Sequence, residues 1–220
     1  MTLVNDSIIV TPGSGATVAT FSPGGSGSTE YQAVMLADAS GHLYETKPTY
    51  VISFPKMTAT ANRYHWELFN GSASTMTLSI YDIRAVVHTD VAIIGTVGLR
   101  YDFFRTTAIS SGGTAGTYES TSTTAANVTR FDTGDSAMSS VVSFKTVLTS
   151  ITTGAWLFTT FVFPEEGNAA ANLHQGFNVL SDKALMKPLM LHPGEGVATR
   201  QGSVAGLGEV GWTLFVTKDP

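Results

Sequence analysis

The sequence predicts an all-β protein, a jelly-roll-like β-sandwich or barrel. Apolar residues recur with a period of two, the β-rich runs are short, and turns rich in glycine and proline separate them. Helical periodicity is almost absent, and no fixed-period repeat points to a solenoid or a propeller. We therefore expect roughly eight to ten strands arranged in a sandwich or barrel.

The first 30 residues differ in composition from the rest of the chain. They alternate short apolar pieces with the segments TPGSG and SPGGSGS, and Gly/Ser-rich composition is typical of flexible linkers. The 220-residue length fits one domain with a small appendage. We predict an N-terminal arm or linker at 1–30 and a single β-sandwich domain at 31–220.

The first half of the predicted domain reads as strands joined by short turns. Pro55 should stop the third strand, because proline cannot donate to a sheet ladder. The Asn70-Gly71 dipeptide after the fourth strand is a strong hairpin signal. The strands expected here are 31–38, 41–46 (a hairpin with the first), 49–54, 64–69 and 75–83.

A long polar stretch, 108–127, divides the second half of the domain. Its small residues predict a long loop, and loops of that size are usually functional, ordered by a partner or disordered. Residues 171–191 are ambiguous between a strand and one helical turn. Strands are expected at 90–107, 141–151, 155–163 and 211–217, and in the first of these Leu99, Tyr101 and Phe103 share one face while Arg100, Asp102 and Phe104 share the other.

The C-terminal stretch LMLHPGEGVATRQGS, residues 189–203, combines glycines with charged residues. Its Pro193-Gly194 dipeptide is a strong turn signal. Residues 189–191 before it and Val197 after it predict the two arms of a hairpin. Glu195 and Arg200 are then expected to make a surface ion pair or a subunit contact.

Composition limits the classes of function. Charged residues are only 13% of the chain, about half the usual share, and the net charge is −5. Nucleic-acid binding needs a basic footprint, so we expect no nucleic-acid partner. Apolar runs stay below the roughly 18 residues of a membrane span, and no signal peptide is recognisable. The chain has no cysteine, which excludes disulfides and Cys-ligated zinc.

Two short motifs could carry chemistry. Asp132-Thr133-Gly134 matches the triplet of aspartic proteases, but the sequence holds it only once, and a second carboxylate, Asp135, follows it. We interpret it as a polar turn. His88 and Asp90 would share one strand face and could ligate a metal, although a strand-end hydrogen bond is the favoured role. The remaining histidines are scattered: His42, His65, His174 and His192.

Other enzymatic signatures are missing from the sequence. It holds neither a G-x-S-x-G elbow nor a phosphate-binding G-x-x-x-x-G-K-[ST] loop. A dispersed Ser-His-Asp triad stays open. We predict a protein that is not an enzyme, with no catalytic, cofactor or metal site. Some aromatic residues could line a sugar-binding face, although core or subunit contact is favoured: Tyr31, Tyr50, Tyr64, Trp66, Trp156 and Trp212.

Two segments of the chain carry ordered motifs. In residues 104–138, Arg105-Thr106-Thr107-Ala108 leads to a Gly112-Gly113-Thr114 turn, a polar loop and an Asp132-x-x-Asp135 exit. Residues 189–203 follow a Leu-x-Pro-Gly-Glu-Gly-hydrophobic-Ala pattern that precedes the last strand. Both segments resemble small virion proteins of tailed bacteriophages. The resemblance covers the middle and C-terminal parts of the chain.

The resemblance implies a structural component of the phage particle. The favoured role is a capsid decoration (cement) protein with a β-jelly-roll fold, a homotrimer that binds the major capsid protein shell. Such a protein would reside in the virion after assembly in the host cytoplasm. Contacts are expected from the arm (1–30) and from residues 106–130. A tail, adaptor or fibre-associated β-domain and a lectin-like binding module remain alternatives.

Overall fold

The computed structural model describes residues 7–9, 17–19, 48–88, 98–162, 174–180, 188–204 and 208–219. The chain divides into two compact units, Met1–Thr46 and Lys47–Pro220. In the first unit, β1 (Ser7–Ile9) and β2 (Thr17–Ala19) pair antiparallel. The hairpin expected at 31–46 lies outside the described residues, and the boundary placed after residue 30 stays a prediction.

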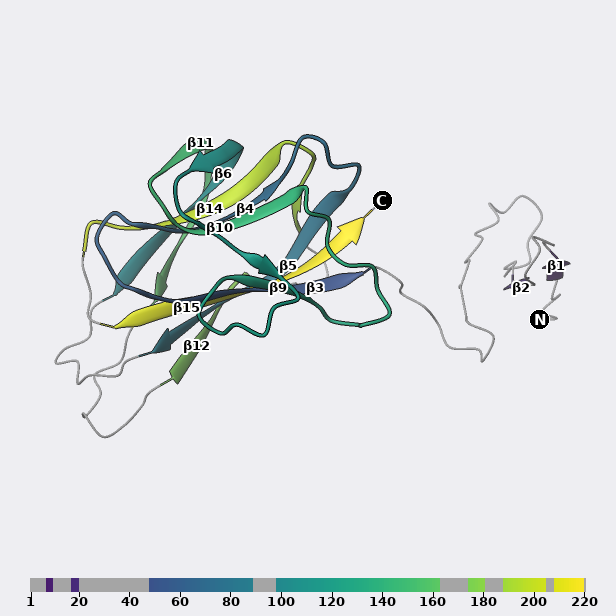
Figure 1. Cartoon of the computed structure of the whole chain (residues 1–220), viewed down its shortest axis with the longest axis horizontal. Helices are drawn as coiled ribbons and strands as arrows, with labels where there is room; N and C mark the ends of the chain where they lie inside the picture. Colours follow the sequence, from purple (N-terminus) through teal and green to yellow (C-terminus); the bar gives the residue numbers. More distant parts are fainter. Residues whose placement is uncertain are drawn as a thin grey trace, which may run out of the picture. The chain divides into compact units, whose positions relative to one another are not determined.

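The second unit is a sandwich of two sheets, which confirms the predicted all-β, jelly-roll-like fold (Figure 1). All its described elements are strands, and every pairing is antiparallel except β8 with β9. The strands are β3 (Thr49–Thr58), β4 (Tyr64–Asn70), β5 (Thr77–His88), β6 (Leu99–Ser111), β7 (Thr114–Ala115), β8 (Thr117–Tyr118), β9 (Asn127–Arg130), β10 (Val142–Leu148), β11 (Ser150–Val162), β12 (His174–Leu180), β13 (Leu189–Leu191), β14 (Glu195–Gln201) and β15 (Glu209–Asp219).

Each sheet draws on strands from both halves of the second unit. The six-stranded sheet has the order β11-β6-β14-β4-β10-β7. The seven-stranded sheet has the order β12-β5-β15-β3-β9-β8, with β13 also paired to β5. The final strand, predicted at 211–217, is confirmed as β15 and lies between β5 and β3.

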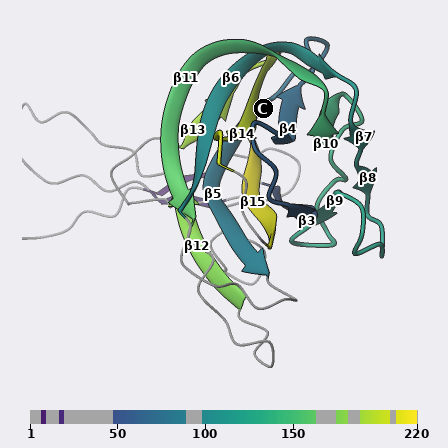
Figure 2. The same ribbon diagram turned by 90° about the vertical axis from the view of Figure 1, so that its left-hand side faces the viewer.

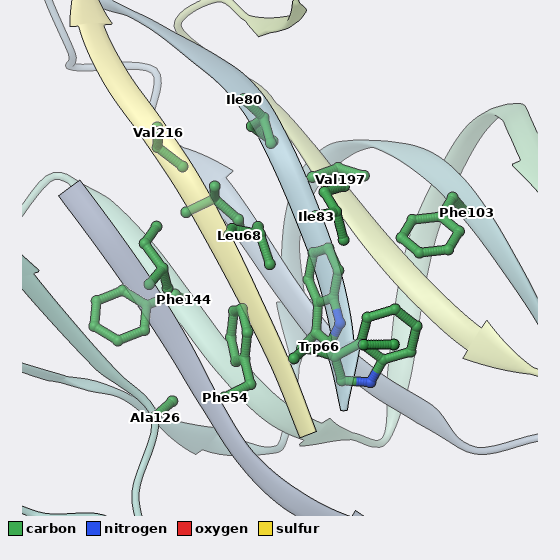
Figure 3. Packing of buried hydrophobic residues seen from close by; sticks show 14 of the residues in the cluster. Phe54, Trp66, Leu68, Ile80, Ile83, Phe103, Ala126, Phe144, Val197 and Val216 are labelled. Atoms are coloured by element: carbon green, nitrogen blue, oxygen red, sulfur yellow. The ribbon is translucent and has the colours of Figure 1, made fainter. Parts of the chain in front are cut away.

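The inner faces of the two sheets make one hydrophobic core (Figure 3). Tyr50, Ile52 and Phe54 of β3 are buried in alternation, as the period of two predicts, and so are Leu99, Tyr101 and Phe103 of β6. Trp66 of β4 lies at the centre of an aromatic cluster. The core residues labelled in Figure 3 are Phe54, Trp66, Leu68, Ile80, Ile83, Phe103, Ala126, Phe144, Val197 and Val216.

The hairpin predicted at Asn70-Gly71 is wrong, because this turn joins the two sheets. β4 belongs to the six-stranded sheet and β5 to the seven-stranded sheet. Asn70 Nδ2 donates hydrogen bonds to the carbonyl oxygens of Met76 (2.8 Å) and Leu191 (3.0 Å). The buried asparagine therefore stabilises a corner between layers and not a two-stranded turn.

The hairpin predicted around Pro193-Gly194 is also wrong, although the turn itself is present. Gly194 has a φ of +85°, and Glu195 N donates to His192 O at 2.9 Å. The strand before the turn, β13, pairs with β5, whereas β14 after it pairs with β4 and β6. The turn is thus a second corner between the sheets.

Pro55 does not end its strand, contrary to expectation. β3 continues to Thr58, and the register with β15 shifts opposite Pro55, between Val210 and Trp212. On its other side β3 pairs with β9 only from Tyr50 to Ser53. The missing N–H of Pro55 therefore falls at an irregular, locally open edge, where proline is tolerated.

The long loop predicted at 108–127 is only partly a loop. β6 continues to Ser111, and two short strands, β7 and β8, follow before the loop 119–126. Residues 174–180, in the ambiguous stretch, form strand β12. Figure 2 shows β6 and β11 running side by side as an arch.

A buried carboxylate fixes the far end of β6 to its sheet. Glu67 of β4 is 1% exposed and accepts hydrogen bonds from Ser110 N (3.0 Å) and Ser110 Oγ (2.7 Å). Lys145 of β10 donates from Nζ to Ser110 O at 2.9 Å. The two bonds from Ser110 satisfy the buried carboxylate, and the bond from Lys145 adds a second link between this end of β6 and the sheet.

Replacing Gly196 with alanine should destabilise the sandwich. A Cβ at this position would lie 2.3 Å from Thr106 Oγ1 and 2.7 Å from Leu68 O, so neighbouring strands would have to move. We expect the free energy of unfolding to fall by about 1–3 kcal/mol, measured by urea denaturation. Gly134→Ala, in an exposed turn with the nearest atom at 3.3 Å, is the matched control and should change stability little. Equal losses in both variants would contradict the close packing at β14.

Candidate functional site: an aromatic and arginine face

The outer surface of the six-stranded sheet carries a cluster of aromatic and arginine side chains across β11, β6, β14 and β4. Cross-strand pairing makes them neighbours: Trp156 lies opposite Phe104, Phe161 opposite Arg100, and Arg200 opposite both Asp102 and Tyr64. Because Leu99, Tyr101 and Phe103 face the core, the residues between them face outward. We call this surface the aromatic–arginine face; its members are Tyr64, Arg100, Asp102, Phe104, Trp156, Thr159, Phe161 and Arg200.

Asp102 holds the polar part of this face together. Its side chain is only 4% exposed. Its Oδ1 accepts hydrogen bonds from Thr159 Oγ1 at 2.6 Å and from Arg100 Nε at 2.9 Å. Its Oδ2 lies 3.8 Å from Arg200 Nη2. The carboxylate is thus a shared anchor for two arginines that remain partly open to solvent.

Arg200 lies between two aromatic rings. Its Cζ is 5.2 Å from the centroid of the Phe104 ring and 5.9 Å from that of Tyr64. Both distances are within the range of a cation–π interaction. The rings restrict the guanidinium to one place on the face while 38% of its side chain stays exposed.

Two large aromatic side chains of the edge strand β11 are open to solvent. Trp156 is 59% exposed and Phe161 is 52% exposed. The register of β11 against β6 shifts repeatedly between Ser150 and Phe158. Such irregularity blunts an edge against strand addition. The outward side chains, more than the edge itself, are therefore the feature suited to a contact.

The two segments that carry the virion-protein resemblance meet beside this face. Arg105 of β6 and Glu195 of β14 form an ion pair at 3.3 Å, as expected for Glu195. Arg105 also donates to the carbonyl oxygen of Met190, and Gly196 lies opposite Thr106. Both segments therefore have structural roles where β6, β13 and β14 converge.

The Asp132-Thr133-Gly134 triplet is a polar turn, as interpreted from the sequence. Gly134 N donates to Asp132 Oδ1 at 2.8 Å, and Asp135 N donates to Asp132 O at 3.1 Å. Asp135 Oδ2 accepts from Thr49 N at 3.3 Å. Both carboxylates therefore accept backbone N–H groups, that of Asp132 within the turn and that of Asp135 from strand β3.

The structure describes only part of the candidate His88/Asp90 pair and of the other histidines. His88 is the last residue of β5, Asp90 and His42 lie outside the described part, and His174 begins β12. His65 is buried and His192 is in the exposed corner turn. Among the residues that the structure covers, no group of three His, Asp or Glu side chains could hold a metal ion.

The described part of the chain contains no helix long and apolar enough to cross a membrane.

A shallow cleft lies on the other sheet, between β3 and the loop after β8. It encloses about 390 Å³ and is uncharged, being lined largely by hydroxyl groups. Its aromatic member, Phe54, is 3% exposed and belongs to the core. The lining residues are Ser53, Phe54, Pro55, Ser120, Thr121, Ser122, Thr123, Ala125 and Asn127.

The aromatic residues singled out from the sequence divide between core and face. Tyr50, Trp66 and Trp212 are buried in the core, and Tyr31 lies outside the described residues. Tyr64 and Trp156 belong to the aromatic–arginine face. Sequence reasoning missed Thr159 and Phe161, although the pairing of Arg100, Asp102 and Phe104 on one side of a strand pointed to the same surface.

The chain was compared with protein-family models, curated proteins and solved structures, and none of the three comparisons finds a match.

Proposed function

We propose that this chain is a structural protein of a tailed-bacteriophage particle, a capsid decoration (cement) protein that binds and stabilises the shell of major capsid protein. The observation that carries the proposal is the aromatic–arginine face. Trp, Tyr and Arg are the residues most enriched at the energetic centres of protein interfaces. The resemblance of residues 104–138 and 189–203 to phage virion proteins supports a phage particle as the assembly to which the chain belongs.

The mechanism is non-covalent bridging of neighbouring capsid subunits. A rigid sandwich presents the face with its side chains already positioned by Asp102, so little conformational entropy is lost on binding. A homotrimer would suit three-fold positions on an icosahedral shell, and closed symmetry is the usual arrangement of homo-oligomers. The arm (1–30) and residues 106–130 would add contacts with adjacent subunits.

Trp156→Ala should weaken binding to expanded capsid shells about 30-fold, because truncating an interface hot spot costs at least about 2 kcal/mol. Binding is measured by co-sedimentation of the purified full chain with shells that lack it. Phe131→Ala is the matched control, since Phe131 is an aromatic residue with 72% exposure outside the aromatic–arginine face. It should bind like the wild type. If the wild-type chain does not bind the shells, the proposal is refuted. If Trp156→Ala and Phe131→Ala bind the shells equally well, the aromatic–arginine face is not the surface that binds them.

A glycan-binding module is the second candidate, and the exposed indole of Trp156 favours it. Sugar rings stack on exposed aromatic faces, and Thr159 supplies a hydroxyl nearby. A glycan array probed with the full chain tests this function. Specific binding that Trp156→Ala abolishes, together with no binding to shells, would establish the second candidate in place of the first.

A further inference from the structure

Among the residues that the structure describes, few groups use the hydrogen-bonding capacity of the Arg200 guanidinium. Its contact with Asp102, at 3.8 Å, is too long for a hydrogen bond. Within the described part of the chain, Nε is buried without a partner. A guanidinium has five N–H donors in a fixed fork. Arg200 is therefore held between two rings with donors still available on its exposed side.

The face also has an excess of positive charge. Among the described residues, Arg100 and Arg200 share one carboxylate, that of Asp102, which leaves a local charge of about +1 on a chain whose net charge is −5. Because 55% of the Arg100 side chain and 38% of the Arg200 side chain are exposed, both can reach a ligand. An anionic group placed on this face would meet two cations that the protein already holds in position.

The acceptors on the face help to distinguish the possible ligands. Sugar hydroxyls need accessible carboxylate or amide acceptors, but Asp102 is 4% exposed and its Oδ1 is already bound by Thr159 and Arg100. The net charge of −5 also disfavours a polyanion such as nucleic acid. A ligand that has one carboxylate next to apolar side chains would complement this face, because the arginines would bind the carboxylate and Trp156 and Phe161 would contact the apolar groups.

We infer that Arg200 and Arg100 form a carboxylate-recognition site for an acidic, apolar segment of a partner protein. The inference rests on the proposed function, in which this face binds a protein. The partner's Asp or Glu side chain accepts hydrogen bonds from the free guanidinium donors, and its apolar residues cover Trp156 and Phe161. A bidentate arginine–carboxylate pair fixes orientation as well as affinity.

The test selects ligands from a displayed library of random short peptides on the immobilised full chain. Wild-type protein should enrich peptides that carry Asp or Glu next to aromatic or aliphatic residues. A selected peptide should bind Arg200→Gln about tenfold to 100-fold more weakly, the loss expected for a charge-assisted hydrogen bond. Arg200→Lys should also lose affinity, since it keeps the charge but not the fork. Thermal unfolding checks that each variant folds.

The outcomes separate this inference from the proposed function. Selected peptides without acidic residues, or peptides that bind Arg200→Gln as well as the wild type, would overturn the carboxylate site while shell binding through Trp156 still stands. Selected peptides that bind Trp156→Ala and Arg200→Gln unchanged would place the contact elsewhere and overturn the inference. A third outcome concerns an acidic sugar. If sialyllactose displaces a selected peptide, while the same peptide with Asn and Gln in place of Asp and Glu does not, the site would recognise the carboxylate of an acidic sugar. That result would overturn the inference of a protein partner.

Discussion

Trp66→Ala should lower the free energy of unfolding by about 3–5 kcal/mol, the usual cost of removing a large buried aromatic side chain. Trp66 is fully buried and stacks on Phe54 at a centroid distance of 5.0 Å. It also makes edge contacts with Phe103 at 5.9 Å and Trp212 at 6.0 Å. Since Phe54 and Trp212 belong to the opposite sheet, the variant removes two of the aromatic contacts between the layers.

Guanidinium denaturation followed by far-ultraviolet circular dichroism measures this loss without relying on tryptophan fluorescence. Trp156→Ala is the matched control, because the same side chain is removed from an exposed position; its stability should stay within about 0.5 kcal/mol of the wild type. Trp66→Phe should cost less than Trp66→Ala, partly because the buried indole N–H has no partner among the described residues. A Trp66→Ala variant as stable as the Trp156→Ala control would contradict the sandwich core.

The regular parts of the fold could be predicted because they depend on local alternation. Leu99, Tyr101 and Phe103 follow a period of two, and all three are buried as expected. The closing strand, β15, is likewise a short β-rich run. In these segments most apolar side chains face the core and most polar side chains face the solvent, so each strand can be predicted from its own residues.

The corners of the sandwich could not be predicted from local turn chemistry. Asn70-Gly71 and Pro193-Gly194 have the residues of hairpin turns, and both reverse the chain as such residues do. Whether the next strand pairs with the last or crosses to the other sheet depends on distant contacts, such as the hydrogen bond from Asn70 Nδ2 to Leu191 O. Those partners are far apart in the sequence and only the folded chain brings them together.

The aromatic–arginine face could not be predicted from the sequence for a related reason. Trp156 and Phe161 are five positions apart, so strict alternation would put them on opposite sides of β11. The register shift between Trp156 and Phe158 turns Leu157 and Phe158 inward together and brings Trp156 to the outer side. This bulge therefore brings Trp156 to the same side of β11 as Phe161, and bulges leave little trace in sequence.

A buried histidine should make the stability of this protein fall in mild acid. His65 is fully buried, and Nε2 lies 3.1 Å from Gln201 Oε1. Gln201 Nε2 donates to Val204 O at 2.8 Å, which turns its Oε1 toward the imidazole as an acceptor. Burial, opposed in part by the Gln201 hydrogen bond, lowers the pKa of His65 from 6.5 to about 4. The neutral imidazole is therefore the form that the folded protein favours.

The sign of the pH dependence follows from which state binds the proton first. Well above pH 6.5 His65 is neutral in both states, so its protonation does not change the free energy of unfolding there. Between pH 6.5 and pH 4 the unfolded chain gains a proton that the folded protein does not, so the free energy of unfolding falls with decreasing pH. The loss reaches about 3 kcal/mol near pH 4 and levels off below it, where the folded protein also becomes protonated.

Urea denaturation at pH 7 and pH 4, compared between wild type and His65→Gln, isolates this contribution, because carboxylates that titrate in both proteins cancel in the difference. The variant should be less stable than the wild type at pH 7, since a packed ring is lost, but its stability should fall by about 3 kcal/mol less on going to pH 4. If His65→Gln and wild type lost equal stability between the two pH values, His65 would have to be hydrated or charged inside the sandwich, which its complete burial beside Tyr101 and Gln201 opposes.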